Sequence, residues 1–411
     1  MNILLINYDF PPNPGIGGRR WAKIAKYLAL KGHYIHVVKA DFPESLSQSP
    51  WQQDVEHPNI QTHSAARKYP KALSHPKEGW VGKIKFHAQK KLMQWREKGT
   101  IYDQSIGWQK TMLPICREIL RNQNIQAIVA TGAPWNLLVY AAQLKIEFPD
   151  VRLLVDYRDP WLTAKNYGMA ALKNARMNAE IKKQQFVFEH ADVVTTPYAY
   201  LTDELRAWGK ERCTHQPKFV TLAHFFDADD IRLESTPPFA KNEFKVVYAG
   251  DVYIGSESQW KGFRTLVEAA ESKLPSDYKL RFELYTNAKM PTYIATMKNV
   301  RIHAPIGKEI FIKMKSADAL LVVLPENKKD ERTTKFYEYL PLRKPMLIVA
   351  PEGEVTAYVE AHSLGVHSSQ SAEVLLSFFN REFSRNIFNS HFAIDEQTAD
   401  SRAKEVIELL S

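Results

Sequence analysis

The first half of the chain alternates short apolar runs with stretches whose apolar residues recur at helical spacing. Residues 3–8 form an apolar run, a helical stretch follows, and a second run covers 34–38. This order is typical of a strand–helix–strand unit with parallel strands. We therefore predict a doubly wound parallel sheet in residues 1–223. The pattern continues in 127–131, 137–146, 151–155 and 193–196.

The alternation stops in a polar segment and then resumes. Residues 224–243 contain three aspartates and the pair Pro237-Pro238, which favour a turn-rich linker. Beyond it, residues 244–390 repeat the alternation, which predicts a second Rossmann-like α/β domain with a parallel sheet. Residues 391–411 are expected to form a helix that crosses back to the first domain. The predicted strands of the second domain are 246–248, 280–285, 319–324 and 346–350.

One segment of the first domain, residues 76–98, departs from this alternation. It contains seven Lys or Arg residues against two glutamates, and its apolar residues fall on one stripe of a helix. Such a helix can lie on the headgroups of an anionic membrane, with Trp95 at the interface. Packing on its own domain with a solvated basic face explains the pattern equally well, so both interpretations stay open. The stripe consists of Val81, Ile84, Ala88, Leu92 and Trp95.

Composition limits the partners and the location. A chain of 411 residues exceeds the size at which one hydrophobic core usually stops growing, which agrees with two domains. The net charge of +9 favours anionic partners, of which we expect phosphates or an acidic membrane surface and no nucleic acid. The N-terminus is unlike a signal peptide, no apolar run approaches about 20 residues, and the two cysteines are far apart. We expect a cytoplasmic protein, at most peripheral on the inner face of the cell membrane.

A glycine-rich loop, residues 15–18, lies between the first predicted strand and the first helix. Free N–H groups and the dipole at a helix start favour a phosphate, to which Arg19 and Arg20 could add charge-assisted bonds. The simplest alternative is a plain glycine turn. A nicotinamide site with Asp41 on the ribose is disfavoured, because Arg20 occupies the third glycine position of that fingerprint.

A second candidate anion site lies in residues 330–340, after the predicted strand 319–324. A helix is expected to begin near Thr333, so its first N–H groups face the sheet edge where ligands bind in doubly wound folds. Lys335 adds a positive charge for a diphosphate, and Glu338 could accept hydrogen bonds from two ribose hydroxyls. The alternative is an ordinary surface pair of these two residues, worth only about 0.2–0.5 kcal/mol.

Residues 334–340, followed by 343–346, resemble the donor-site signature of family four retaining glycosyltransferases. The resemblance spans about residues 1–365 and implies the GT-B fold, in which two Rossmann-like doubly wound domains face each other across a cleft. Three further motifs occur in the order expected of that family. They are Pro11-Pro12 with Gly17-Gly18, the run 156–161, and Tyr248-Ala249-Gly250 with Lys261-Gly262.

By this resemblance the C-terminal domain binds a nucleotide sugar. Glu338 would contact the donor ribose, while Lys261 and Lys335 would bind the diphosphate and be catalytic by stabilising its charge. The other implied donor contacts are Arg19, Gly250, Ile306, Asp330, Thr333 and Thr334.

The resemblance assigns the acceptor to the N-terminal domain. Arg158 and Asp159 would lie beside the acceptor, with Asp159 in a catalytic role; their alternative is a buried ion pair or a loop cap. The backbone of Gly17 and Gly18 would reach the distal phosphate from across the cleft.

Two positions depart from the family pattern. The family places a glutamate eight residues before Glu338, where this chain has Asp330 with Glu331 beside it, and the sequence does not choose between them for sugar contact. Many members carry an arginine after the strand glycine, where this chain has Asp251. The charge for the diphosphate must then come from the two lysines.

We expect no metal and no cofactor beyond a UDP- or GDP-linked co-substrate. The run 227–229 matches the metal-binding D-x-D pattern of another glycosyltransferase fold, but it lies in the predicted linker. The predicted reaction is retaining sugar transfer to a glycan or lipid-linked hydroxyl, in the synthesis of surface polysaccharide or lipopolysaccharide. Two alternatives stay open: a sugar-nucleotide epimerase of similar fold and a non-catalytic glycan-assembly scaffold.

Overall fold

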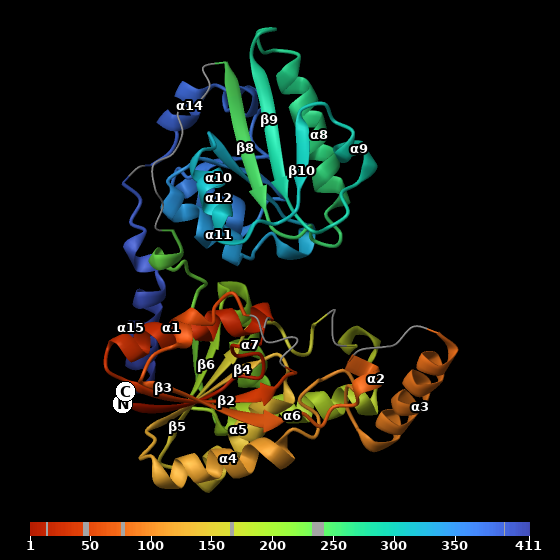
Figure 1. Cartoon of the computed structure of the whole chain (residues 1–411), viewed down its shortest axis with the longest axis vertical. Coiled ribbons are helices and arrows are strands. Elements are labelled where there is room, and N and C mark those ends of the chain that lie inside the picture. Colours follow the sequence, from red (N-terminus) through yellow and green to blue (C-terminus); the bar gives the residue numbers. More distant parts are fainter. Residues whose placement is uncertain (14, 44–48, 75–78, 165–167, 232–241, 390) are drawn as a thin grey trace. The chain divides into compact units, whose positions relative to one another are not determined.

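The computed structural model describes residues 1–13, 15–43, 49–74, 79–164, 168–231, 242–389 and 391–411. They form two compact units, each built on one parallel sheet with helices on both faces (Figure 1). Unit 1 comprises Met1–Ala223 with Ala399–Ser411, and unit 2 comprises His224–Thr398.

The sheet of unit 1 has seven parallel strands. They are β1 (Asn2–Ile6), β2 (Tyr34–Asp41), β3 (Ile60–Ala66), β4 (Ala127–Gly132), β5 (Arg152–Tyr157), β6 (Val193–Thr196) and β7 (Lys218–Thr221). Their order is β3-β2-β1-β4-β5-β6-β7, with Ile3 level with Ala127. The strand order reverses between β1 and β4, so the carboxyl ends of these two strands form the topological switch point, where such folds bind ligands.

Helices bury both faces of this sheet, which is why its central strands are continuous apolar runs. Helix α1 lies against α15 on one face, and α4 and α5 lie on the other (Figure 1). The C-terminal helix α15 thus belongs to unit 1. The helices of unit 1 are α1 (Arg19–Leu30), α2 (Lys71–Ser74), α3 (Trp80–Arg96), α4 (Gln109–Asn122), α5 (Asn136–Glu147), α6 (Ala175–His190), α7 (Ala199–Arg212) and α15 (Ala399–Leu410).

Unit 2 repeats the architecture with six parallel strands. They are β8 (Glu243–Ala249), β9 (Lys279–Tyr285), β10 (Val300–His303), β11 (Ala319–Val323), β12 (Met346–Val349) and β13 (Gly365–His367). The order is β10-β9-β8-β11-β12-β13, so the switch point lies between β8 and β11. The helices are α8 (Glu257–Glu271), α9 (Thr292–Ala295), α10 (Ile310–Lys315), α11 (Thr334–Tyr339), α12 (Glu354–Ala361), α13 (Ala372–Ser377) and α14 (Arg381–Asn386).

The predicted fold class, two Rossmann-like doubly wound domains, is confirmed. The pattern missed four strands, β3, β7, β10 and β13, all of which lie at the edges of the two sheets. Edge strands are paired on one side only and tolerate polar residues, so their apolar signal is weak.

The predicted linker is largely part of unit 2 where the structure describes it. Residues 224–231 belong to unit 2, and Pro237-Pro238 lie outside the described residues. The carboxylate of Asp227 accepts a hydrogen bond from the Asp229 amide at 3.0 Å, and Asp230 pairs with Lys308 at 2.9 Å. These acids therefore have structural partners.

Within the described residues, no helix is both long enough and apolar enough to cross a membrane.

Candidate functional site

Lys335 lies at the switch point of unit 2. It stands in the first turn of α11, which follows the loop that leaves β11, and its side chain reaches the end of β8. The Nζ atom donates hydrogen bonds to Tyr248 Oη at 2.7 Å and to the carbonyl oxygen of Asp251 at 2.8 Å. The same atom lies 4.3 Å from the ring centroid of Tyr248 and 4.9 Å from that of Tyr253, a cation–π arrangement. Two tyrosines and one backbone carbonyl thus surround the ammonium.

Burial dominates the electrostatics of Lys335. Only 9% of the residue is exposed, and this desolvation lowers its pKa from 10.5 to about 7, while the charges of Asp251 and Glu338 raise it. The oxygens that accept its hydrogen bonds are a hydroxyl and a carbonyl, which carry no charge. An anionic ligand at this point would stabilise the ammonium form and raise the pKa.

Gly250 provides the space that Lys335 occupies. A Cβ atom at this position would overlap Lys335 Cε and lie 3.0 Å from Nζ. Its φ of +117° is also a conformation that L-residues rarely adopt. Side-chain space and backbone conformation therefore both require glycine at the end of β8.

The remaining signature residues of unit 2 lie around α11. Thr333 is buried at the helix start, beside the hydroxyl of Tyr253, and Thr334 and Glu338 are half-buried. Because α11 has only six residues, its dipole is weak. The positive charge at this edge therefore resides mainly on Lys335.

Asp330 has a structural partner. Its Oδ1 accepts a hydrogen bond from the Glu354 amide at 2.9 Å, so it satisfies the start of α12. The neighbouring Glu331 is buried and pairs with Lys328. Each of the two candidate acids for sugar contact thus already has a structural partner.

Two other predicted donor residues lie elsewhere in unit 2. Lys261 is exposed in the second turn of α8, and Ile306 is half-buried in the loop after β10. Within the described residues, no hydrogen bond or ion pair joins Lys261 to Lys335. The structure therefore brings Gly250, Thr333 and Lys335 together and leaves Lys261 in a different environment.

The switch point of unit 1 gathers a second set of predicted residues. Gly17 and Gly18 form the last turn before α1, and Arg158 follows β5. A Cβ atom on Gly17 would overlap the Arg158 guanidinium and lie 2.7 Å from Asp9 Oδ2, so these three residues are in close contact. Arg158 also pairs with Asp159 at 3.3 Å, with Asp159 half-exposed. The predicted phosphate loop and acceptor pair are thus adjacent.

Asp9 carries the distinctive electrostatics of this cluster. Burial raises the pKa of its carboxyl above 3.8, and the nearby Arg158 guanidinium only partly opposes that shift. The cluster therefore places a half-buried acid beside a cation.

The arginines after the glycine loop are buried. Arg20 donates to the carbonyls of Leu222 and Ala223 and lies 3.5 Å from the buried Asp156 carboxylate. It therefore holds the end of the sheet together, and its contact with a phosphate stays a prediction. Arg19 is likewise only 7% exposed.

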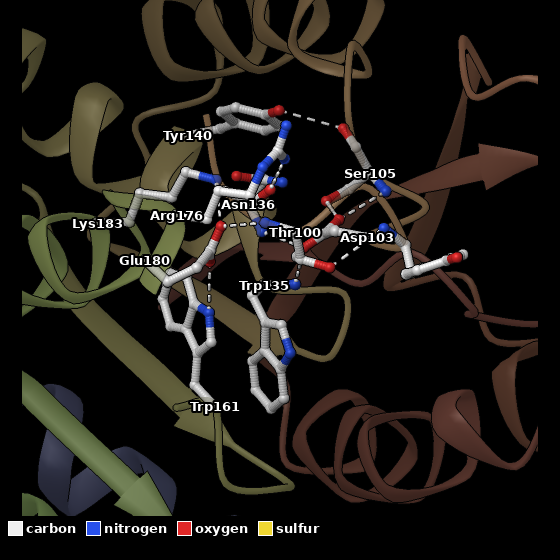
Figure 2. Close-up of polar contacts among 12 residues, drawn as sticks. Thr100, Asp103, Ser105, Trp135, Asn136, Tyr140, Trp161, Arg176, Glu180 and Lys183 are labelled. Atoms are coloured by element: carbon white, nitrogen blue, oxygen red, sulfur yellow. Dashed lines mark hydrogen bonds and ion pairs between the residues drawn. The ribbon is translucent and has the colours of Figure 1, made fainter. Parts of the chain in front are cut away.

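Two buried carboxylates, Asp103 and Glu180, support the loops that follow β4 and β5 (Figure 2). Asp103 Oδ2 accepts from the amides of Trp135 and Asn136, at 2.6 and 2.8 Å, and so caps α5 after the loop that leaves β4. Glu180 accepts from the indole N–H of Trp161 at 2.9 Å, just after β5. The Trp135 and Trp161 rings stack with centroids 5.7 Å apart. The loops after β4 and β5 are thereby fixed at the switch point.

Comparison with known proteins tests the architecture. No protein-family model and no curated protein sequence matches the chain. Solved structures do match. A glycosyltransferase from Rickettsia africae is similar with a TM-score of 0.60 and 12% identity, over 100% of this chain and 97% of that one. Sucrose-phosphate synthase from Thermosynechococcus elongatus is similar with a TM-score of 0.54 and 12% identity, over 100% and 96%.

A third similar structure is the UDP-GlcNAc 2-epimerase from Methanocaldococcus jannaschii, with a TM-score of 0.51 and 10% identity, over 100% and 99% of the two chains. At such identities the similarity concerns the fold alone. The chain has the GT-B fold. Because transferases and an epimerase share it, the GT-B fold does not choose between these activities.

Sequence reasoning missed three residues of this GT-B chain. Tyr253 borders Lys335, Asp9 borders Gly17, and Asp103 holds the loop after β4. A signal existed for the first two, since each follows the central strand of its unit within a few residues. Asp103 lies far from its partners in sequence, so nothing local indicates its role.

Within the described residues, no group of three or more His, Cys, Asp or Glu side chains is placed to hold a metal ion.

Proposed function

We propose that this protein is a retaining glycosyltransferase that moves a sugar from a UDP- or GDP-sugar to a hydroxyl of a glycan or lipid-linked acceptor. The observation that carries the proposal is Lys335, a buried ammonium at the unit 2 switch point whose hydrogen-bond acceptors are neutral. A diphosphate is the anion expected at that position of a doubly wound sheet. The GT-B fold and the signature around Glu338 agree with this assignment.

In this proposal unit 2 binds the donor. Lys335 contacts the diphosphate, Gly250 allows that contact, and the half-buried Glu338 accepts hydrogen bonds from the ribose. The exposed Lys261 adds charge once a donor is bound. Thr333, Thr334, Asp330 and Ile306 complete the donor contacts that the family resemblance implies.

The proposed reaction exchanges one bond at the anomeric carbon. The bond to the distal phosphate oxygen breaks, its electron pair stays on the diphosphate, and Lys335 stabilises the developing charge. The acceptor hydroxyl forms the new bond on the same face of the sugar and gives its proton to the departing diphosphate. Arg158 and Asp159 position the acceptor on unit 1, and no metal is required.

Ligand binding tests the donor assignment. We expect UDP or GDP to raise the melting temperature of the wild type, and Lys335→Met to weaken nucleotide binding about 100-fold, because a charge-assisted contact contributes about 1.5–3 kcal/mol. Lys344→Met is the matched control, because Lys344 is half-buried and burial lowers its pKa to about 8, but it precedes β12 and so lies at the other end of the parallel strands. Equal affinity of the Lys335 variant and the wild type would overturn the proposal.

Product analysis separates the alternatives. A transferase needs an acceptor and releases the nucleoside diphosphate in equal amount to the glycosylated product. The epimerase, favoured by the similar M. jannaschii structure, would convert a UDP-sugar without an acceptor. A scaffold would bind no donor. Incubating a panel of UDP- and GDP-sugars with and without extracts of surface polysaccharide and lipopolysaccharide, followed by mass spectrometry, distinguishes the three.

A further inference from the structure

Helix α3 carries an apolar stripe that faces away from the protein. Of the twelve large apolar side chains that are exposed in the described structure, five lie on α3. Trp80 and Trp95, near its two ends, are 75% and 84% exposed. The other three are Val81, Ile84 and Leu92, and with Trp95 and the exposed Ala88 they form the stripe predicted from the sequence. A concentration of exposed apolar surface of this kind marks an interaction site.

The opposite side of α3 holds the helix to unit 1. Met93 is buried and Phe86 half-buried in a small cluster with Leu73 of α2. At about 100° per residue, Phe86 and Met93 share one face, while the exposed stripe lies on the other side of the helix. Figure 1 shows α2 and α3 side by side at one flank of unit 1. The stripe is therefore available in the folded protein.

Basic residues flank the stripe on both sides. Residues 80–96 contain five Lys or Arg residues and no Asp or Glu. On a helix Lys85 projects to one side of the apolar stripe and Lys83 and Lys91 to the other, and all three are exposed. The two tryptophans lie about 22 Å apart along the axis, so the apolar stripe spans nearly the whole helix.

We propose that α3 docks unit 1 on an anionic lipid bilayer, with the helix axis parallel to the surface. The apolar stripe would enter the interface, with Trp80 and Trp95 at headgroup level and the flanking lysines against anionic headgroups. A second copy of the chain is a poorer partner for this surface, because two such helices would bring their lysines together. The proposal does not depend on the proposed transferase activity.

Vesicle sedimentation tests the proposal with the full chain and no nucleotide. We expect binding to vesicles of phosphatidylcholine with phosphatidylglycerol, weak binding to phosphatidylcholine alone, and a loss of binding in high salt. Trp80→Ser with Trp95→Ser should weaken binding at least about tenfold. Leu30→Ser with Ile146→Ser is the matched control, because both residues are exposed apolar positions of unit 1 away from α3.

The contribution of the α3 lysines to vesicle binding is tested separately. Replacing Lys83, Lys85 and Lys91 with Gln should weaken binding at least about tenfold, whereas replacing the exposed Lys273, Lys279 and Lys313 of unit 2 with Gln should change it little. Because all these positions are exposed, unchanged melting temperatures will verify folding. Equal binding to both vesicle types, equal loss in the control variants, or dimerisation that the tryptophan variant abolishes would each overturn the proposal.

Discussion

The two switch points have the same topology and opposite electrostatics. In unit 2 a buried cation, Lys335, is held by a hydroxyl and a carbonyl, and its pKa is lowered to about 7. In unit 1 a half-buried acid, Asp9, lies beside the Arg158 guanidinium, and desolvation raises its pKa. Desolvation favours the neutral form of each group, so Lys335 loses its proton more easily and Asp9 keeps its proton more strongly.

In a doubly wound domain, the place where a ligand binds and the charge it must carry have different determinants. The parallel sheet determines that ligands meet the carboxyl ends of β1 and β4 or of β8 and β11. The side chains at those ends determine the charge that a ligand must carry. A bound anion would stabilise the charged form of the buried Lys335. The cluster at Asp9, in contrast, already contains both a positive and a negative charge.

The glycines give the largest contrast. Gly250→Ala should destabilise unit 2 by about 3 kcal/mol, because it adds strain at φ +117° to the overlap with Lys335. Gly17→Ala, at an ordinary φ, should cost about 1 kcal/mol, because the Arg158 and Asp9 side chains can move. Urea unfolding of both variants measures the difference. A smaller loss in Gly250→Ala would show that its backbone conformation is not required.

The sequence predicted the central strands but not the edges. β11 and β12 are buried on both faces and are therefore apolar throughout. A continuous apolar run of this kind is recognisable from the local sequence alone. β3, with sequence IQTHSAA, contains four consecutive polar residues, and β13 has only three residues. Such strands form because their backbone hydrogen-bonds to a neighbouring strand. The local sequence does not indicate which strand that is.

The candidate site was predictable in position but not in environment. Lys335 and Gly250 follow strands, so topology alone places them at the ligand edge. The burial of Lys335 between two tyrosines depends on packing between distant segments, as do the cap that Asp330 provides to α12 and the burial of Arg20. Polar residues in a motif thus identify an edge of the sheet, while tertiary contacts decide which of them face a ligand.

The burial of Lys335 makes the stability of unit 2 depend on pH. The folded pKa of Lys335, about 7, lies below its unfolded value of 10.5, so the unfolded chain binds more protons between these values. Its contribution to stability therefore rises with pH, by about 2 kcal/mol between pH 7 and 9. Lys335→Met should lack this rise. Urea unfolding of wild type and variant at several pH values measures it, and parallel pH curves would show that Lys335 is not desolvated.

The lowered pKa of Lys335 also links nucleotide binding to pH. If a diphosphate binds the charged form of Lys335, binding above pH 7 requires uptake of a proton. We expect nucleotide affinity to fall up to about tenfold, or 1.4 kcal/mol, per pH unit between about 7.5 and 8.5, where the phosphates are already ionised. Calorimetry in buffers of different ionisation enthalpy counts the protons. No uptake in the wild type, or the same uptake in Lys335→Met, would contradict the linkage.

The smallest effect belongs to Asp9. Its folded pKa lies above 3.8, so the folded state binds more protons just above that pH, and stability falls as pH rises through this window. At pH 7 the desolvated charge of Asp9 thus lowers stability, because desolvation exceeds the attraction of Arg158. Asp9→Asn should stabilise unit 1 by about 1 kcal/mol or less at pH 7, with the gain absent below pH 3.8. Asp159→Asn, at a half-exposed position, should show neither the stabilisation at pH 7 nor its dependence on pH. A loss of stability in Asp9→Asn would mean that Arg158 depends on the carboxylate, and the two switch points would then differ in charge pairing instead of desolvation.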